Sequence, residues 1–233
     1  MSDTEFVFLS FEGPDKYSRM GGLATRVTGL LSKLAQRGVR DTPLLRGRPA
    51  LPGHEVQQDG RLHLHRWCQW ISQHHLGGAY DGEPGKLWDW ERSFPAFLLT
   101  KLLPEVIASG RVAVIIGEEW QAANVLITLH KVVSHSDWHR QVRLVWNAND
   151  TPGFEKIDWA VLREAATITT VNRYKKYVMQ RQGIVARAIP NGIEDRWLKP
   201  VPPAKGRSRA DVDPVNCRPI HHRPVHLQPE SRR

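Results

Sequence analysis

The fold is decided by residues 13–38, GPDKYSRMGGLATRVTGLLSKLAQRG, and by the apolar run FVFLSF at 6–11 that precedes them. Six apolar or small residues in a row are typical of a buried strand. After Gly22, apolar side chains recur on one face of a helix, at Leu23, Val27, Leu30, Leu31, Leu34 and Ala35. Gly38 is placed to end that helix in a left-handed cap. The segment therefore predicts a strand, a glycine loop and a helix.

Such a unit directs the first free N–H groups of its helix toward whatever occupies the loop. The positive end of the helix dipole favours an anion at this point. The pair Gly21 and Gly22 lets the backbone approach a ligand that a Cβ would exclude. A simple tight turn explains the same two glycines equally well, so the loop alone leaves both interpretations open.

The rest of the chain repeats this pattern of short apolar strands and amphipathic helices. Strands are expected within 39–45, 61–67, 112–116, 141–148, 166–171 and 184–189, and helices within 122–133 and 173–182. Asn172 is a natural N-cap for the second of these helices, and Gly183 a natural stop. Alternating strands and helices predict an α/β fold with a single Rossmann-like, doubly wound parallel sheet covered on both faces.

In such sheets, ligands bind at the carboxyl ends of the strands. The polar residues and glycines expected at these ends form the candidate binding set: Gly21, Gly22, Glu118, Glu119, Asn147, Asn149, Arg173, Asn191 and Gly192.

Composition excludes several other classes of protein. No apolar run approaches the roughly 18 residues that span a bilayer, and acidic residues near the N-terminus argue against a signal peptide. We therefore expect a cytoplasmic protein that does not bind membranes. Two cysteines, Cys68 and Cys217, lie far apart in dissimilar sequence and fit reduced thiols.

The chain divides into two regions of different composition. Much of the net charge of +9 lies beyond Lys199, in a segment rich in proline and arginine. Proline at this density blocks helices and removes backbone donors, so we expect residues 1–199 to form the domain and residues 200–233 a disordered tail. The tail lacks the interleaved aromatic residues of a nucleic-acid platform, which argues against binding to RNA or DNA.

Three motifs in order resemble the glycogen and starch synthases and the related family 4 glycosyltransferases. They are FEGPDKYSRMGGLATRVTGLLSKLAQRG at 11–38, IIGEEWQAANVLI at 115–127 and TITTVNRYKKYVMQRQGIVARAIPNGIEDRW at 167–197. The resemblance covers roughly residues 5–200. It implies the N-terminal, acceptor-side domain of a GT-B glycosyltransferase, which is typically retaining and metal-independent. A nucleotide sugar would be its co-substrate, with no other cofactor, and a carbohydrate or small molecule its acceptor.

The chain also departs from the pattern of that family. Lys16 stands further from the glycines than the synthase lysine does, so Arg19 is the residue that would supply the charge. Glu118 and Glu119 stand where the synthases have His-Asp. No second Rossmann-like domain follows, so we expect a truncated or frame-shifted copy that needs a separate second GT-B domain as its partner and is inactive alone. The catalytic residues stay unassigned.

Two other functions are consistent with these features. One is a non-catalytic remnant that binds a sugar or nucleotide, and the other is a different GT-B activity, such as a nucleotide-sugar epimerase or a phosphorylase-like enzyme. The aromatic residues Tyr80, Trp88 and Trp90 lie in a segment, 74–90, that reads as a glycine-rich loop. They would either stack on sugar rings or pack on one another.

Overall fold

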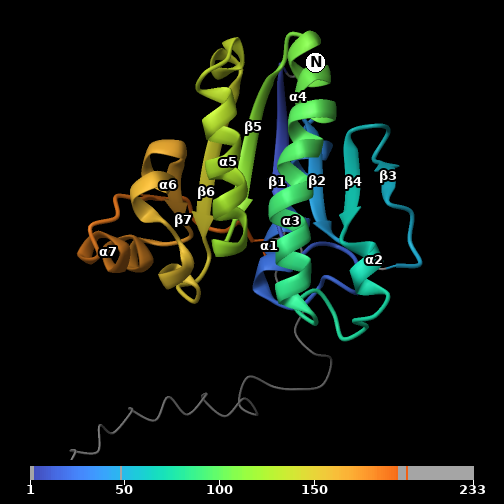
Figure 1. Ribbon diagram of the computed structural model, residues 1–233, viewed down its shortest axis with the longest axis horizontal. Helices are drawn as coiled ribbons and strands as arrows, with labels where there is room; N and C mark the ends of the chain where they lie inside the picture. Colours follow the sequence, from blue (N-terminus) through green and yellow to red (C-terminus); the bar gives the residue numbers. More distant parts are fainter. Residues whose placement is uncertain (1–2, 48, 194–197, 199–233) are drawn as a thin grey trace, which may run out of the picture. The chain divides into compact units, whose positions relative to one another are not determined.

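An eight-stranded sheet runs through the protein, seen here in a computed structural model that describes residues 3–47, 49–193 and 198 (Figure 1). All the elements below lie in one unit, Met1–Gly192; the second unit, Ile193–Arg233, contains two of the described residues. The expected tail at 200–233 lies outside the described residues. No helix in the described part of the chain is long and apolar enough to cross a membrane.

The sheet order is β3-β4-β2-β1-β5-β6-β7-β8, and within it only β3 is antiparallel, where it pairs with β4. The strands are β1 Thr4–Leu9, β2 Arg40–Arg46, β3 His54–Gln57, β4 Leu62–Trp67, β5 Val112–Glu118, β6 Val142–Ala148, β7 Thr167–Thr170 and β8 Arg187–Ala188. The order grows outward from β1 in both directions, so the topological switch lies between β1 and β5. This confirms the predicted doubly wound sheet. The short edge strand β3 was not expected.

Helices lie between most of the parallel strands, as the sequence pattern predicts, although none lies between β2 and β4 and three follow one another between β4 and β5. They are α1 Gly22–Gln36, α2 Gln69–Ser72, α3 Glu83–Phe97, α4 Leu103–Ala108, α5 Ala123–Val133, α6 Trp159–Ala165 and α7 Arg173–Arg181. A π-helical turn, Leu98–Leu102, joins α3 to α4. Asn172 caps α7 by accepting a hydrogen bond from the Lys175 N–H at 2.7 Å. Gly38 and Gly183 follow α1 and α7 with positive φ, as expected of helix-ending glycines.

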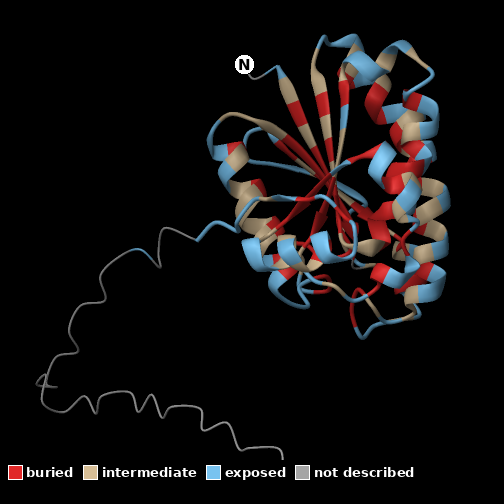
Figure 2. Cartoon of the chain, turned by 90° about the vertical axis from the view of Figure 1, so that its left-hand side faces the viewer, coloured by how far each residue is buried: buried red, intermediate tan, exposed pale blue. Residues whose placement is uncertain are grey.

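Helices cover both faces of the sheet, and the strands between them are largely buried (Figure 2). Side chains that alternate along β1 contribute to two separate cores, one on each face. Phe8 points to the face covered by α1, where it packs with Val27 and Leu31. Val7 and Leu9 point to the other face, which α3, α5 and α6 cover. Burying both faces explains why the central strands β1 and β5 read as almost continuous apolar runs.

The segment 74–90 is only partly the loop that its glycines suggest. A helix, α3, begins at Glu83, with Pro84 in its first turn, where proline is well tolerated. Trp90 is fully buried and packs on Phe11 and Phe94, with ring centroids 4.9 and 4.1 Å apart. Helical spacing of Trp90, Phe94 and Leu98 outweighs the local glycine signal. Trp90 is therefore a core residue that cannot stack on a sugar, whereas Trp88 on the same helix is exposed.

Candidate functional site

A polar network lies at the carboxyl ends of β5 and β6, beside the topological switch. Its centre is the carboxylate of Glu118, whose side chain is fully buried. Glu118 Oε2 accepts hydrogen bonds from the side-chain amides of Asn147 and Asn149, each at 2.8 Å. Its Oε1 pairs with Arg26 Nη2 at 3.2 Å. The buried carboxylate is thus fully supplied with donors, as a stable buried charge requires.

Arg26 connects this network to the segment that follows β8. It lies one turn into α1, with a side chain 11% exposed. Its Nη1 donates to Asn191 Oδ1 at 2.7 Å. The guanidinium on α1 therefore joins Glu118 of β5 to Asn191 in the segment after β8, and Glu118 in turn binds the two asparagines at the end of β6. We call Arg26, Glu118, Asn147, Asn149 and Asn191 the switch-point network.

Glu119 follows directly, in a conformation that non-glycine residues rarely adopt. Its φ is 65°, which carries a cost of about 1–3 kcal/mol and often marks a functional position. Its carboxylate accepts hydrogen bonds from the backbone N–H groups of Asn149 at 2.7 Å and Asp150 at 3.0 Å. Burial raises the pKa of Glu119 to about 7, although these two amides act in the opposite direction. Near neutral pH this group can hold or release a proton.

The N-terminus of α1 is occupied by a carboxylate of the protein itself. Glu12 Oε2 accepts hydrogen bonds from the N–H groups of Gly21 at 2.9 Å and Ala24 at 3.1 Å, and Tyr80 donates to Glu12 Oε1 at 2.8 Å. The favourable place for an anion at this helix end is therefore partly filled. The N–H of Gly22 has no hydrogen-bond partner among the described residues, and a Cβ added there meets nothing within 4 Å.

Other residues of the predicted set lie apart from the network. Arg19 is exposed and donates to the Pro14 carbonyl at 2.7 Å. Arg173 is exposed at the start of α7, and Gly192 is exposed beyond β8. The structure thus brings together Glu118, Asn147, Asn149 and Asn191, with Glu119 adjoining them.

Three further residues belong to the site and were missed by the sequence analysis: Glu12, Arg26 and Lys175. The Lys175 ammonium contacts the Asn149 carbonyl and pairs with Asp150 at 3.2 Å. Arg26 follows Gly22 by four residues, one helical turn, and that spacing was the available signal. Glu12 has no comparable signal, because its role depends on the path of the loop.

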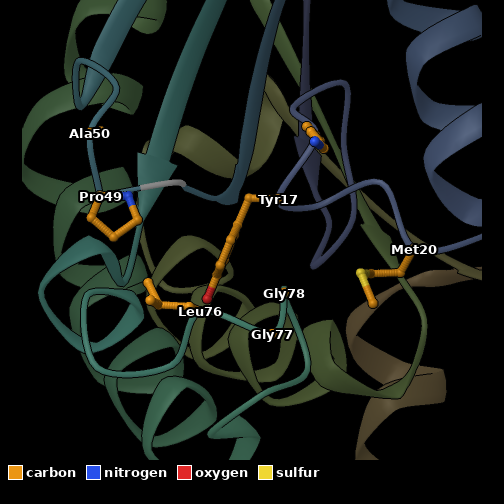
Figure 3. Close-up of a pocket in the computed structure, with 8 residues that line it drawn as sticks. Tyr17, Met20, Pro49, Ala50, Leu76, Gly77 and Gly78 are labelled. Carbon is orange, nitrogen blue, oxygen red and sulfur yellow. The ribbon is translucent and has the colours of Figure 1, made fainter.

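A cavity of about 460 Å³ opens beside the loop that leads into α1 (Figure 3). It is lined by Lys16, Tyr17 and Met20 from the loop after β1, by Pro49 from the segment after β2, and by Gly77 and Gly78 before α3. The Tyr17 side chain extends across it toward Leu76, with Met20 on the opposite side. Its volume lies in the range of small-molecule sites.

The histidines do not gather into a metal site in the described part of the chain, where no three His, Cys, Asp or Glu side chains are placed to hold an ion. His65 stacks on His54 with ring centroids 4.2 Å apart, and His63 bonds to the Gly60 carbonyl. Burial lowers the pKa of His65 to about 4. These rings pack against one another rather than around an ion.

No protein-family model and no curated protein matches this chain. Among solved structures, it is similar to the catalytic domain of starch synthase IV from Arabidopsis thaliana bound to ADP and acarbose. The TM-score is 0.48 and the sequence identity 14%, over 86% of this chain and 54% of that one. The chain therefore spans about half the length of the protein it matches.

Proposed function

We propose that this protein is a glycosyltransferase domain that takes part in moving a hexosyl group from a nucleotide sugar to a sugar or small acceptor. The observation that carries the proposal is the position of the switch-point network. It lies at the carboxyl ends of β5 and β6, next to the reversal of strand order, where doubly wound folds bind their ligands. The three sequence motifs that resemble glycosyltransferases contribute Arg26, Glu118 and Asn191 to this network, which supports the same assignment.

In this proposal, Arg26 and the Gly22 N–H meet the donor phosphates. Transfer from a nucleotide sugar separates a phosphate leaving group from an electron-deficient sugar carbon, and fixed donors and cations lower the cost of that charge. Glu118 is a positioning residue that holds the Arg26 guanidinium. Asn149 and Asn191 present amide groups to sugar hydroxyls. Arg26 takes the role that the sequence analysis expected of Arg19.

Titration calorimetry with UDP-, ADP- and GDP-glucose tests this assignment. The double variant Arg26→Met/Glu118→Gln removes the ion pair together, so no buried charge is left unpaired. We expect at least tenfold weaker binding of the preferred nucleotide sugar, the loss typical of one charge-assisted hydrogen bond. The matched control, Arg19→Met, removes an exposed arginine near the same loop and should bind like the wild type. Equal affinity in the double variant would place the donor elsewhere.

Release of free nucleotide separates transfer from mere binding. The same nucleotide sugars are incubated with the protein and a panel of sugar acceptors, and free UDP, ADP or GDP is measured. Acceptor-dependent release supports a transferase. Binding without release over the whole panel supports a non-catalytic nucleotide-binding protein, and conversion of the nucleotide sugar without an acceptor supports an epimerase.

A further inference from the structure

Two cations are buried directly behind the wall of the cavity. Lys86, from α3, is fully buried and donates hydrogen bonds to Tyr17 Oη at 2.6 Å and to the Gly78 carbonyl at 3.0 Å. Arg46, at the end of β2, is also fully buried and donates from Nη1 to the Ala79 carbonyl at 2.9 Å. Two of these acceptors, on Tyr17 and Gly78, belong to residues that line the cavity itself.

Neither cation forms an ion pair within the described residues. Arg46 Nε and Nη2 have no hydrogen-bond partner there, and the guanidinium lies 3.0 Å from the centroid of the Phe11 ring. No carboxylate is paired with Lys86 in the same part of the chain. Burial lowers the pKa of Arg46 to about 9, and burial together with Arg46 lowers the pKa of Lys86 to about 8. Both lowered pKa values reflect the free-energy cost of keeping two cations away from water and without an ion-pair partner.

The same domain neutralises another buried arginine in the ordinary way. Arg66 is almost as deeply buried, and it pairs with Asp15 at 2.6 Å and with Glu55 at 2.7 Å. Tyr17 and Cys68 lie near both cations, and burial raises the pKa of each, so both are uncharged at neutral pH. Two carboxylates act on the pair from further away, Glu83 on Arg46 and Asp81 on Lys86, and neither forms an ion pair with it in the described part of the chain. A protein that brings two carboxylates into contact with one arginine and none into contact with a nearby pair of cations leaves a place for an anion from outside.

We propose that Arg46 and Lys86 form a subsite for the phosphate or carboxylate group of a hexose-sized molecule that enters the cavity. The carbonyls of Gly78 and Ala79 now point at the two cations, and the anion replaces them. Gly78 has a φ of 121° and Gly82 a φ of 68°, so the segment between them carries glycines that permit this change. That the bound molecule is the acceptor rests on the proposed function; the anion binding does not.

Three hexoses of similar size test the subsite on the full chain: glucose, glucose 6-phosphate and glucuronate, titrated by calorimetry at pH 7. We expect at least one anionic sugar to bind tenfold or more tightly than glucose, since hydrogen bonds between charged groups are the stronger class. The two anions distinguish a phosphate subsite from a carboxylate subsite. Equal affinity for all three sugars would overturn the proposal.

Variants assign the preference to the buried pair. Lys86→Met and Arg46→Met each remove an unpaired buried charge while keeping an apolar chain, so both are expected to fold, which thermal melting checks. Each should abolish the preference for the anionic sugar. Lys16→Met removes an exposed lysine from the cavity mouth and should keep the preference. If Arg46→Met does not fold, Lys86→Met alone decides.

The variants also distinguish selection of the anion by the buried pair from selection by surface charge. A preference that survives in Lys86→Met, or that disappears in Lys16→Met, would show that surface charge rather than the buried pair selects the anion. None of these probes contains a nucleotide. Binding of an anionic sugar without any nucleotide-sugar binding would therefore reject the proposed function and leave the subsite standing, and the opposite result would reject only the subsite.

Discussion

Two buried charged clusters lie on either side of β1 at the same edge of the sheet, and they are built on opposite principles. The Glu118 carboxylate receives hydrogen bonds from Arg26, Asn147 and Asn149, so its charge is neutralised within the chain. The cations Arg46 and Lys86 donate only to carbonyls and a hydroxyl, and the Arg46 guanidinium lies over an aromatic ring. The first cluster is complete as it stands, and the second is complete only with an added anion.

The difference matters because, in both clusters, burial removes a charged group from water and this costs free energy. A charge taken out of water is tolerated when a partner of opposite sign and enough hydrogen bonds replace the water. Removing one member from the complete cluster should therefore lower the free energy of unfolding. Removing one member from the incomplete cluster should not. Single variants of each cluster test this contrast.

The largest effect is expected from Arg26→Ala. This change leaves the buried Glu118 carboxylate with two amide donors and no counter-charge, so the free energy of unfolding should fall by about 3 kcal/mol. Urea denaturation followed by circular dichroism measures it. Arg19→Ala, which removes an exposed arginine of the preceding loop, is the control and should change stability by less than about 0.5 kcal/mol. A loss equally small in Arg26→Ala would mean that the network is not a stabilising unit.

The next effect concerns a buried acid without a partner at the opposite end of the sheet. Asp41 is fully buried, neither of its carboxylate oxygens has a partner among the described residues, and burial followed by Glu5 raises its pKa to about 7. A raised pKa means that the folded state binds the proton more tightly than the unfolded chain. Stability from this group is therefore present below about pH 4 and lost as the pH rises toward 7.

Asp41→Asn should remove that contribution, making the free energy of unfolding less dependent on pH between 4 and 7. Denaturation at closely spaced pH values measures the slope. Glu119 has a raised pKa in the same window, so Glu119→Gln should remove a further part. A slope unchanged in Asp41→Asn would show that this carboxyl titrates normally.

A smaller effect of opposite sign is expected for Lys86. Its lowered pKa, about 8, means that the folded state releases the proton before the unfolded chain does. The free energy of unfolding should therefore rise as the pH increases from about 8 to about 10.5, and this rise should be absent in Lys86→Met. At pH 7 the variant should be at least as stable as the wild type, gaining about 1 kcal/mol. Marked destabilisation at pH 7 would place Lys86 among the structural charges.

An interaction could be predicted from the sequence when it joins residues that are close together along the chain. The strand, glycine loop and helix around Gly22 were predictable because strand and helix periods are local properties. The Asn172 cap was predictable for the same reason, since an N-cap contacts residues three positions away. The carboxyl-edge placement of Glu118, Asn147 and Asn149 followed from the rule that parallel strands end at one edge.

The interactions that complete the clusters were not predictable, because they join distant parts of the chain. Arg26 and Glu118 are 92 positions apart, and Tyr80 and Glu12 are 68 apart. The burial of Lys86 could not be predicted for a different reason. The preceding glycines make its segment read as a loop, and only tertiary packing of Trp90 in the core shows that α3 begins at Glu83. A buried lysine cannot be recognised before the helix that buries it.

The smallest effect on stability, and the most informative one on binding, is expected from Gly22→Val. A Cβ at this position meets nothing within 4 Å, and Gly22 does not need a positive φ. Stability should therefore change by less than about 0.5 kcal/mol. The same Cβ projects beside the free N–H that is proposed to meet the donor phosphate, so nucleotide-sugar affinity should fall. Gly29→Val is the matched control: it lies in the same helix and is equally open. If both variants bind the nucleotide sugar like the wild type, the donor does not approach α1, and Glu12 has closed that helix end to phosphate.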